Sequence, residues 1–452
     1  MPQPTHPAQR RGTADRLRWT LAADVCARVR RPPGIPRARV AQELGISSGT
    51  AADLVTRMRE AAILNERTPV PHGRGRPTSE LTAHPEGPLV VAIEITATGW
   101  RMATAGLDGR LTATASAPHR GRGPDVVLAP IRRAVAAEAN GRPGRVRAVS
   151  VAVAATVREG TVVQSSVLDW DQVSLAPLAV PDTALLVAND ATCEALAESR
   201  RGASRGAHSA LHLTVLTGVG GGLVLDGAPV LGATGLAMEI GHLPLGDPEA
   251  VCDCGARGCW DTVLGTRPLA GRLRAEDDSA AGVGAIIARG APAHRPAIEA
   301  ASASLGSGLA GLINVTDPDV VTLGGIGPLL RDHSPRAFEE SLTGGLMQCL
   351  RGEAPRVVVG ELGADAALVG AVEAALDEVA SPAGLAASLP RNRRRPYAGD
   401  MTTSRDTTGR HPQPLVYVVV NPSKPWATDA VRRRAATALR DAGYADPVWL
   451  ET

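Results

Sequence analysis

The sequence predicts an α/β protein made of a small helical head and a larger body in which strands and helices alternate. Apolar residues recur at helical spacing through residues 15–62, and short β-branched runs alternate with helical segments from about residue 88 to residue 380. Hydrophobic residues make up 44% of the 452 residues and aromatic residues only 2%, so we expect an aliphatic core. A body of this size exceeds one simple layer, and we expect it to form two lobes.

The head is expected to contain three helices. Apolar residues at helical spacing predict the first helix over residues 15–30, and the RPPGIP segment at 31–36 ends it. A second, short helix is predicted over residues 37–44, and Ser47 or Ser48 can cap a third one. Two helices joined by a tight, glycine-containing turn are typical of the helix-turn-helix motif.

The segment after the third helix is polar and rich in Gly and Pro, as expected for a wing tip and linker. Residues 14–80 are therefore predicted to form a winged helix-turn-helix that binds DNA. Residues 1–80 hold fourteen Arg against seven Asp and Glu, while the whole chain carries a net charge of +2, and this asymmetry favours a polyanionic partner. The residues expected to contact operator DNA are Arg37, Arg39, Ser47, Ser48, Thr50, Arg57, Arg74 and Arg76.

Arg74 and Arg76 flank a glycine in a sequence that resembles the core of an AT-hook. An extended Arg-Gly-Arg segment can place two guanidinium groups in a narrow A·T minor groove, where the potential is most negative. The alternative is an arginine-rich linker that reflects biased composition, because 47 of the 48 basic residues are arginine and Lys424 is the exception.

Composition also excludes several classes. The polar N-terminus lacks the apolar segment of a secretory signal, and no stretch approaches the ~18 apolar residues that span a bilayer. We therefore expect a cytoplasmic protein without a membrane partner. The scarcity of aromatic residues argues against proteins that stack many bases.

The body is expected to begin with a strand and to alternate strands with helices. Predicted helices cover residues 124–139, 191–200 and 297–314. Predicted strands cover residues 88–95, 109–116, 147–155, 184–190, 209–216, 221–227 and 319–325.

Three of the six cysteines crowd into the eight residues CDCGARGC, and a histidine precedes them. Three thiolates and one imidazole form the kind of ligand set that zinc favours in closed tetrahedral structural sites. The alternative is a group of buried cysteines beside an incidental histidine. The predicted zinc ligands are His242, Cys252, Cys254 and Cys259.

The stretch GVGGGLVLDGAPVLGATGLAMEIGHLPLGDPEAVCDCGARGCWDT resembles the signature of the ROK family (repressors, open reading frames and sugar kinases). The ExGH and CxCGxxGCxE motifs of that family appear here as Glu239–His242 and Cys252–Asp261, with Asp in place of the last Glu. The resemblance extends over residues 88–380 and includes VAND at 187–190 and DPDVVTLGGIG at 317–327. It implies a two-lobed, actin-like (ribonuclease H-like) sugar-kinase fold behind a winged helix-turn-helix, as in ROK repressors.

The resemblance also implies a set of sugar-binding residues. In the kinases of the family, the residue at Asp190 is the general base toward a sugar hydroxyl, and His242 would bind sugar as well as zinc. The alternative for Asp190 and Glu239 is that they are solvated surface carboxylates. The implied sugar ligands are Asn189, Asp190, Glu239, His242 and Asp261.

One departure from the family pattern bears on whether the protein is a kinase or a regulator. ROK kinases begin their first strand with a DxGGT-like phosphate loop, but AIEITATG has Glu94 in place of the Asp, and Thr96 and Ala97 in place of the glycines. Side chains therefore crowd the place where phosphate should approach the backbone, which argues against ATP and Mg²⁺ as cofactors. A second loop and a later turn keep their glycines, which also suit plain hairpins and tight turns. The residues that match nucleotide-side positions are Thr217, Gly218, Gly220, Gly221, Gly324 and Gly325.

Residues 381–414 are poor in apolar side chains and are predicted to be a linker. Residues 415–452 resemble the opening of a diacylglycerol kinase-type lipid kinase domain, with a strand, Asn421-Pro422, a helix and a second strand. We expect a truncated fragment of such a domain. The alternative is a native tail that packs on the body.

The sequence thus predicts a sugar-responsive transcriptional regulator, most simply a repressor. It would bind a palindromic operator as a homodimer or higher homo-oligomer, with a sugar or sugar derivative as effector and zinc as a structural metal. One alternative is an ATP-dependent sugar kinase of the glucokinase type. Another is a lipid kinase, if the C-terminal fragment belongs to a longer chain.

Overall fold

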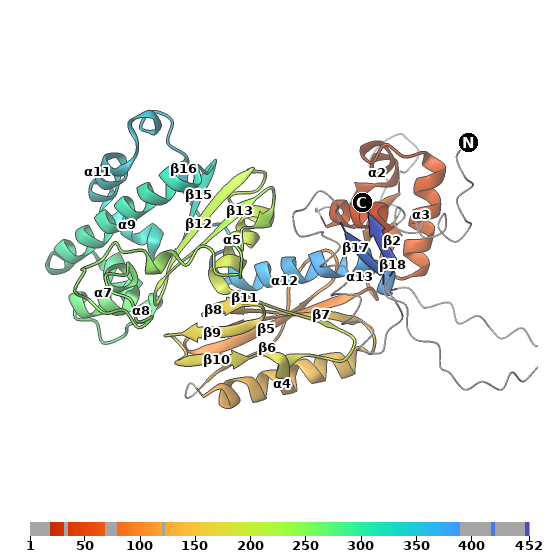
Figure 1. The fold of residues 1–452 in the computed structure, drawn as a ribbon, viewed down its shortest axis with the longest axis horizontal. Coiled ribbons are helices and arrows are strands. Elements are labelled where there is room, and N and C mark those ends of the chain that lie inside the picture. The colour runs from red at the N-terminus through yellow and green to blue at the C-terminus, as the bar shows by residue number, and fades with distance from the viewer. Residues whose placement is uncertain are drawn as a thin grey trace, which may run out of the picture. The chain divides into compact units, whose positions relative to one another are not determined.

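The computed structural model describes residues 19–30, 35–67, 79–119, 123–388, 417–420 and 448–451. The chain divides into two compact units, residues 1–391 and residues 392–452. The first unit contains the helices of the head and two large five-stranded sheets (Figure 1).

The head contains three helical segments and a small sheet. Residues 19–29 are helical, and α2 (Arg37–Glu43) and α3 (Ser48–Glu60) follow. Ser47 caps α3, because its hydroxyl accepts a hydrogen bond of 3.1 Å from the backbone N–H of Thr50. Antiparallel strands β1 (Ile35–Pro36), β3 (Glu80–Ala83) and β2 (Leu64–Arg67) complete the head in that order.

The first large sheet has the strand order β11-β7-β4-β5-β6. Its first three strands in sequence form an antiparallel meander, and the other two run parallel to β4. Helix α4 (Pro124–Gly141) connects the two parts. The strands are β4 (Leu89–Ile95), β5 (Gly99–Ala105), β6 (Thr112–Pro118), β7 (Val146–Val153) and β11 (Ala184–Asn189).

The second large sheet repeats this topology with the order β14-β13-β12-β15-β16. Its first three strands are again antiparallel neighbours and its last two are again parallel to the first. The strands are β12 (Ser209–Val215), β13 (Val219–Leu225), β14 (Ala228–Pro229), β15 (Val320–Gly325) and β16 (Arg356–Val359). The helices of this lobe are α6 (Asp261–Leu264), α7 (Thr266–Leu273), α8 (Ala280–Arg289), α9 (Arg295–Thr316), α10 (Gly327–His333) and α11 (Pro335–Gly345).

Two helices, α5 (Asp190–Arg201) and α12 (Ala366–Val379), pack against each other between the sheets (Figure 1). The contact is backbone to backbone, because a Cβ on Gly370 of α12 would lie 1.9 Å from the carbonyl oxygen of Cys193 on α5. One apolar cluster joins buried residues of the head, such as Val25 and Leu54, to α12 residues such as Leu376. The cores of the head and of the first lobe are therefore continuous.

The strands and helices predicted for the body are present, and the structure contains further elements. A small sheet in the order β10-β9-β8 follows β7, and the strands β5 and β16 have no predicted counterpart. Strand β5 was missed because its sequence GWRMATA holds a single β-branched residue, Thr104. The strands of the small sheet are β8 (Thr156–Arg158), β9 (Thr161–Ser165) and β10 (Trp170–Ser174).

The linker predicted from residue 381 begins too early. Residues Pro382–Ser388 form helix α13, in which Leu385 is fully buried against the same apolar cluster as α12. In the second unit, strands β17 (Tyr417–Val420) and β18 (Val448–Glu451) pair in parallel. The predicted helix between them, Asn421-Pro422 and most of the predicted linker lie outside the described residues. None of the described helices is long and apolar enough to cross a bilayer.

Candidate functional site: an acidic cleft beside a cysteine and histidine cluster

A cleft of about 420 Å³ lies between the two large sheets and is lined from both lobes. The first lobe contributes the turn after β4 and the end of β11, and the second lobe contributes the segments around residues 214–221 and 238–242. All five residues expected to bind sugar line this cleft. They are Asn189, Asp190, Glu239, His242 and Asp261.

Asn189 and Asp190 stand at the junction of β11 and α5. The Asn189 side chain caps α5 by accepting a hydrogen bond of 3.2 Å from Thr192 N, and its amide donates a bond of 3.1 Å to the Ala155 carbonyl. Asp190 Oδ1 accepts a bond of 2.9 Å from Ala191 N. The cap fixes the direction in which the helix leaves the strand and so places Asp190 in the cleft.

Carboxylates crowd around Asp190. Desolvation, together with the nearby charges of Glu194 and Glu94, raises the pKa of Asp190 to about 8. At neutral pH the group is therefore mostly protonated. A neutral carboxyl group both donates and accepts hydrogen bonds, which matches the hydroxyl groups of a polyol.

Glu94, which takes the place of the metal-binding Asp in the family pattern, is already paired. Arg101 stands directly opposite it on β5, and its Nε donates a hydrogen bond of 2.6 Å to the Glu94 carboxylate. The same guanidinium group donates to Asp365 Oδ1 at 2.8 Å and to the carbonyl of Ala364. Burial raises the pKa of Glu94, although Arg101 opposes that rise.

Glu194 was missed by sequence reasoning. It lines the cleft one helical turn after Asp190, and its Oε2 lies 2.9 Å from Nε2 of His212 on β12. The other ring nitrogen, Nδ1 of His212, is 2.8 Å from Oγ1 of Thr322 on β15. The spacing of four residues between Asp190 and Glu194 was the available signal, because it places both side chains on one helix face.

Glu239 and Asp261 line the opposite side of the cleft. Desolvation raises the pKa of both carboxyl groups. Asp261 Oδ1 accepts a hydrogen bond of 2.7 Å from Val219 N, and a Cβ on Gly241 would lie 2.2 Å from that oxygen. Asp261 therefore holds the start of β13 in place and also lines the cleft.

The glycines of the second loop have a packing role. A Cβ on Gly220 would lie 2.7 Å from Cβ of Ala191, and one on Gly221 would lie 2.4 Å from Cδ1 of Ile240. These glycines let β13 approach α5 and the segment before the cysteines. Gly324 and Gly325 pack against β12 and do not belong to the described cleft lining. Thr217, Gly218, Gly220 and Gly221 do line it.

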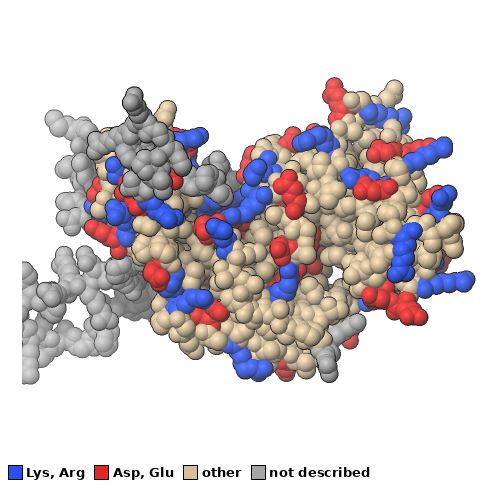
Figure 2. Space-filling model, turned by 180° about the vertical axis from the view of Figure 1, so that it is seen from behind, with Lys and Arg blue, Asp and Glu red and all other residues tan. Residues whose placement is uncertain are grey.

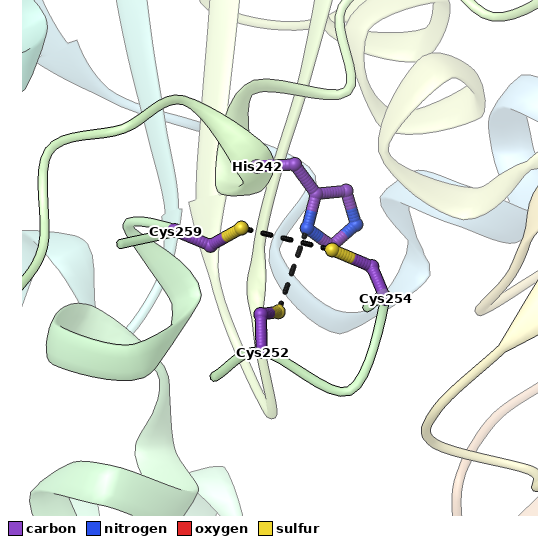
Figure 3. Close-up of side chains that lie close together, drawn as sticks. All are labelled: His242, Cys252, Cys254 and Cys259. Carbon is purple, nitrogen blue, oxygen red and sulfur yellow. Dashed lines mark hydrogen bonds between the residues drawn. The ribbon is translucent and has the colours of Figure 1, made fainter. Parts of the chain in front are cut away.

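The four predicted zinc ligands converge beside this cleft (Figure 3). Their ligand atoms lie within 4.8 Å of one another, with Cys252 Sγ 3.8 Å from His242 Nδ1 and Cys254 Sγ 3.6 Å from Cys259 Sγ. A tetrahedron with zinc–sulfur arms of about 2.3 Å has edges of roughly 3.8 Å, so the spacing and the donor chemistry fit zinc.

The predicted DNA contacts on α2 and α3 are exposed. Arg39 and Arg57 form ion pairs within their own helices, with Glu43 at 2.9 Å and Asp53 at 3.0 Å, and Arg37 is paired with Glu66 at 3.2 Å. Exposed pairs of this kind contribute little stability and are readily exchanged for another anion. Ser47, Ser48 and Thr50 lie at the start of α3, and Arg74 and Arg76 fall outside the described residues.

Two sheets of identical topology with a cleft between them define the actin-like sugar-kinase fold class. Residues 90–378 match the model of the ROK family, and the chain belongs to that family. Glucokinase of Streptomyces coelicolor is 27% identical over 318 residues, which are 64% of this chain and 97% of that enzyme. A putative xylose repressor of Caldicellulosiruptor sp. is 28% identical over 183 residues, 36% of this chain and 46% of the repressor.

Two solved structures extend the comparison. A ROK family transcriptional regulator, a homologue of the E. coli MLC protein, has a TM-score of 0.69 at 21% identity, covering 82% of this chain and 99% of its own. A ROK family glucokinase from Streptomyces griseus, in complex with glucose and AMPPNP, has a TM-score of 0.54 at 26% identity, covering 63% of this chain and 98% of its own. The regulator's fold thus matches more of this chain than the fold of the glucokinase does.

Proposed function

We propose that this chain is a DNA-binding transcriptional regulator that responds to a sugar in the cleft. The observation that carries the proposal is the Glu94–Arg101 ion pair in the cleft wall. A kinase needs a free carboxylate at that position for the metal of the nucleotide, whereas Glu94 is neutralised by a fixed guanidinium group. Hydroxyl groups of a sugar need no such metal, and the remaining polar lining suits them.

The head supports the DNA-binding part of the proposal. We assign residues 14–80 as a winged helix-turn-helix, with α3 as the recognition helix and β2 and β3 as the wing. The larger coverage by the regulator structure supports this assignment, because it extends beyond the part of the chain that the glucokinase covers. We further propose that two heads of a homodimer bind a palindromic operator.

The distribution of charge along residues 1–80 supports DNA contacts from the segments that flank the helices of the head. Through residue 80, the described residues hold seven Arg and six Asp and Glu, whereas segments 1–18, 31–34 and 68–78 hold seven Arg and one Asp. Basic and acidic side chains are interspersed over the face of the body in Figure 2. We propose that flanking arginines, Arg74 and Arg76 among them, neutralise phosphates or enter the minor groove while α3 reads bases.

Zinc is proposed as a structural metal. His242, Cys252, Cys254 and Cys259 would hold it and would fix the loop 252–259 against the 3-10 turn Ile240–His242. Coordination through Nδ1 would leave Nε2 of His242 for a ligand in the cleft. The metal would thus position a sugar ligand without taking part in a reaction.

Salt-dependent binding of the full chain to its own upstream DNA tests the proposal. Arg57→Ala should weaken binding and reduce the salt slope by about one. The matched control is Arg336→Ala, because Arg336 is also exposed and also pairs with an acid on the adjacent helical turn, but on α11 of the body. Equal binding by the wild type and both variants at all salt concentrations would contradict a DNA-binding role for α3.

A second candidate function is an ATP-dependent sugar kinase. It is favoured by the position of Asp190 in the cleft, where a general base toward a sugar hydroxyl would stand, and by the similarity to glucokinases. A lipid kinase remains a proposal only for a longer chain, because it depends on the resemblance of residues 415–452 alone.

A further inference from the structure

Two acidic residues of α12, Glu373 and Asp377, bind arginines from both the head and the body. Oε2 of Glu373 accepts a hydrogen bond of 2.6 Å from Arg30, which directly follows the first helix of the head. Oε1 of Glu373 accepts a bond of 2.6 Å from Arg201 at the end of α5. One helical turn later, Asp377 accepts bonds from Arg30 at 2.7 Å and from Arg200 at 3.1 Å. Three guanidinium groups therefore share two carboxylates.

The part of this junction at Glu373 is buried, unlike the ion pairs on the surface of the head. The side chains of Glu373 and Arg30 are 3% and 8% exposed, whereas that of Asp377 is 42% exposed. Charge-assisted hydrogen bonds that are shielded from water are stronger than exposed pairs. Loss of one partner also leaves a buried charge uncompensated. The hydrogen bonds between Arg30 and Glu373 therefore help to hold the head against α12.

Helix α5 leads from the cleft to the junction along one polar face. Asp190, Glu194, Glu198 and Arg201 follow one another at helical spacing, so they lie on the same side of the helix. Glu194 pairs with His212 on β12, and Glu198 accepts backbone hydrogen bonds from Glu361 and Leu362 of the second lobe. After the first turn, each turn of α5 thus has a charged side chain in contact with another element, and the last of these contacts joins Arg201 to Glu373.

Helix α12 is also tied to the cleft at its other end. Arg101, which pairs with Glu94 in the cleft wall, donates a hydrogen bond of 2.8 Å to Asp365 immediately before α12. The backbone contact between Gly370 and Cys193 leaves no room for the two helices to approach further. A shift of α5 relative to α12 must therefore appear at the ends of the helices, where the arginines bind.

We propose that Glu373 and Asp377 form a competitive junction through which the state of the cleft controls the head. Arg200 and Arg201 of α5 compete with Arg30 for the two carboxylates, because neighbouring guanidinium groups repel one another and because Arg30 and Arg200 both donate to Oδ1 of Asp377, at 2.7 and 3.4 Å. A ligand that moves the Arg200–Arg201 end of α5 away from α12 leaves Arg30 more firmly held, and one that moves this end toward α12 weakens the hold on Arg30. The head then shifts between populations that differ in DNA binding. The ligand part rests on the proposed function, whereas the competition is a property of the ligand-free chain.

The competition is tested without ligand or DNA by hydrogen exchange in the full chain. Arg201→Gln should slow exchange of the amides in residues 19–30 by about threefold or more, because Arg30 becomes the sole cation on Glu373. Arg331→Gln is the matched control. Arg331 is as exposed as Arg201 (20% each), and it pairs with Asp332 in the second lobe.

The dependence on Arg30 distinguishes the junction from a general change in stability. In an Arg30→Gln background, Arg201→Gln should have no further effect on the exchange of residues 19–30. If Arg30→Gln does not fold, Arg30→Lys serves, because a lysine keeps the charge but cannot bridge two carboxylates as a guanidinium fork does. Exchange in Arg201→Gln equal to that in Arg331→Gln would overturn the proposal, and so would an undiminished effect in the Arg30 background.

A second measurement adds ligand. D-glucose, D-xylose and N-acetyl-D-glucosamine are screened by thermal shift, and any sugar that raises the melting temperature is used at saturation. The sugar should change the exchange of residues 19–30 by about threefold or more in the wild type and should leave it unchanged in Arg30→Gln. A full sugar effect in Arg30→Gln overturns the junction. If no sugar binds, the proposed effector class fails, while the ligand-free measurement still decides the junction.

Discussion

Glu94 and Arg101 face each other across β4 and β5 and form an ion pair at the place where ROK kinases have a metal-binding Asp. Opposite charges directly across an antiparallel pair stabilise the hairpin, so this carboxylate serves the structure of the lobe. Thr96 and Ala97 follow it where the family pattern has glycines. The ion pair and the two side chains together depart from the pattern of a nucleotide-binding loop, and this departure supports the proposed regulator.

We therefore expect no sugar-dependent ATP turnover by the purified full chain. A coupled assay across common hexoses should give the same background for the wild type and for Asp190→Asn. Turnover that requires sugar and disappears in Asp190→Asn would identify the chain as a kinase. Arg101→Ala should not create activity and should lower stability by about 1–3 kcal/mol, because it leaves the Glu94 carboxylate unpaired in the cleft wall.

The zinc prediction follows from the convergence of His242, Cys252, Cys254 and Cys259. Metal analysis of the purified protein should find about one zinc ion per chain. Cys254→Ser should lose the metal and lower the melting temperature by about 5 °C or more, because metal binding contributes to the stability of the folded state. Cys349→Ser is the control, since Cys349 is an exposed cysteine outside the cluster. Equal zinc content in both variants would contradict the site.

The raised pKa of Asp190 predicts how stability depends on pH. The folded pKa of about 8 lies above the ordinary value of 3.8, so the native state binds one more proton than the unfolded state between these values. The stability contributed by the protonated form is complete below about pH 4 and is lost as the pH rises toward 8. Asp190→Asn keeps the neutral form, so it should melt above the wild type at pH 9, with a gap that shrinks toward pH 6.

The control for this prediction is Asp171→Asn, because Asp171 is an exposed carboxylate on β10 that does not line the cleft. Its melting temperature should follow that of the wild type at every pH. A gap between Asp190→Asn and the wild type that stays constant from pH 6 to pH 9 would show that Asp190 does not titrate in this range.

The sequence predicted those parts of the site that depend on local spacing. The cysteines lie within eight residues, and the spacing of three between Glu239 and His242 places both at one short turn. The sugar-binding set came from the family resemblance, and all five residues line one cleft. Contacts between distant segments could not be predicted, because spacing says nothing about which helix meets which. Arg30 and Glu373, for example, are 343 residues apart in the chain.

The sequence also left the role of some residues open. The glycines of Thr217–Gly222 match a phosphate loop, but Gly220 and Gly221 are needed for the close approach of β13 to Ala191 and Ile240. A phosphate loop and a close approach between elements both require glycine. The sequence therefore cannot distinguish these two roles, and only the packing in the structure can. Similarly, the low apolar content after residue 381 hid α13, in which Leu385 is fully buried.

The contact between α5 and α12 gives a last prediction about the stability of the fold. Gly370→Ala would place a Cβ 1.9 Å from the carbonyl oxygen of Cys193, and the nearest atoms are backbone atoms of Cys193 that cannot rotate away. The helices must separate, and we expect a loss of about 2 kcal/mol or more in the free energy of unfolding. Gly344→Ala on α11 is the matched control, because its Cβ meets no atom within 4 Å and alanine favours a helix by about 1 kcal/mol. Chemical denaturation followed by circular dichroism measures both variants. Equal effects on the denaturation midpoint would show that the helices are not in backbone contact.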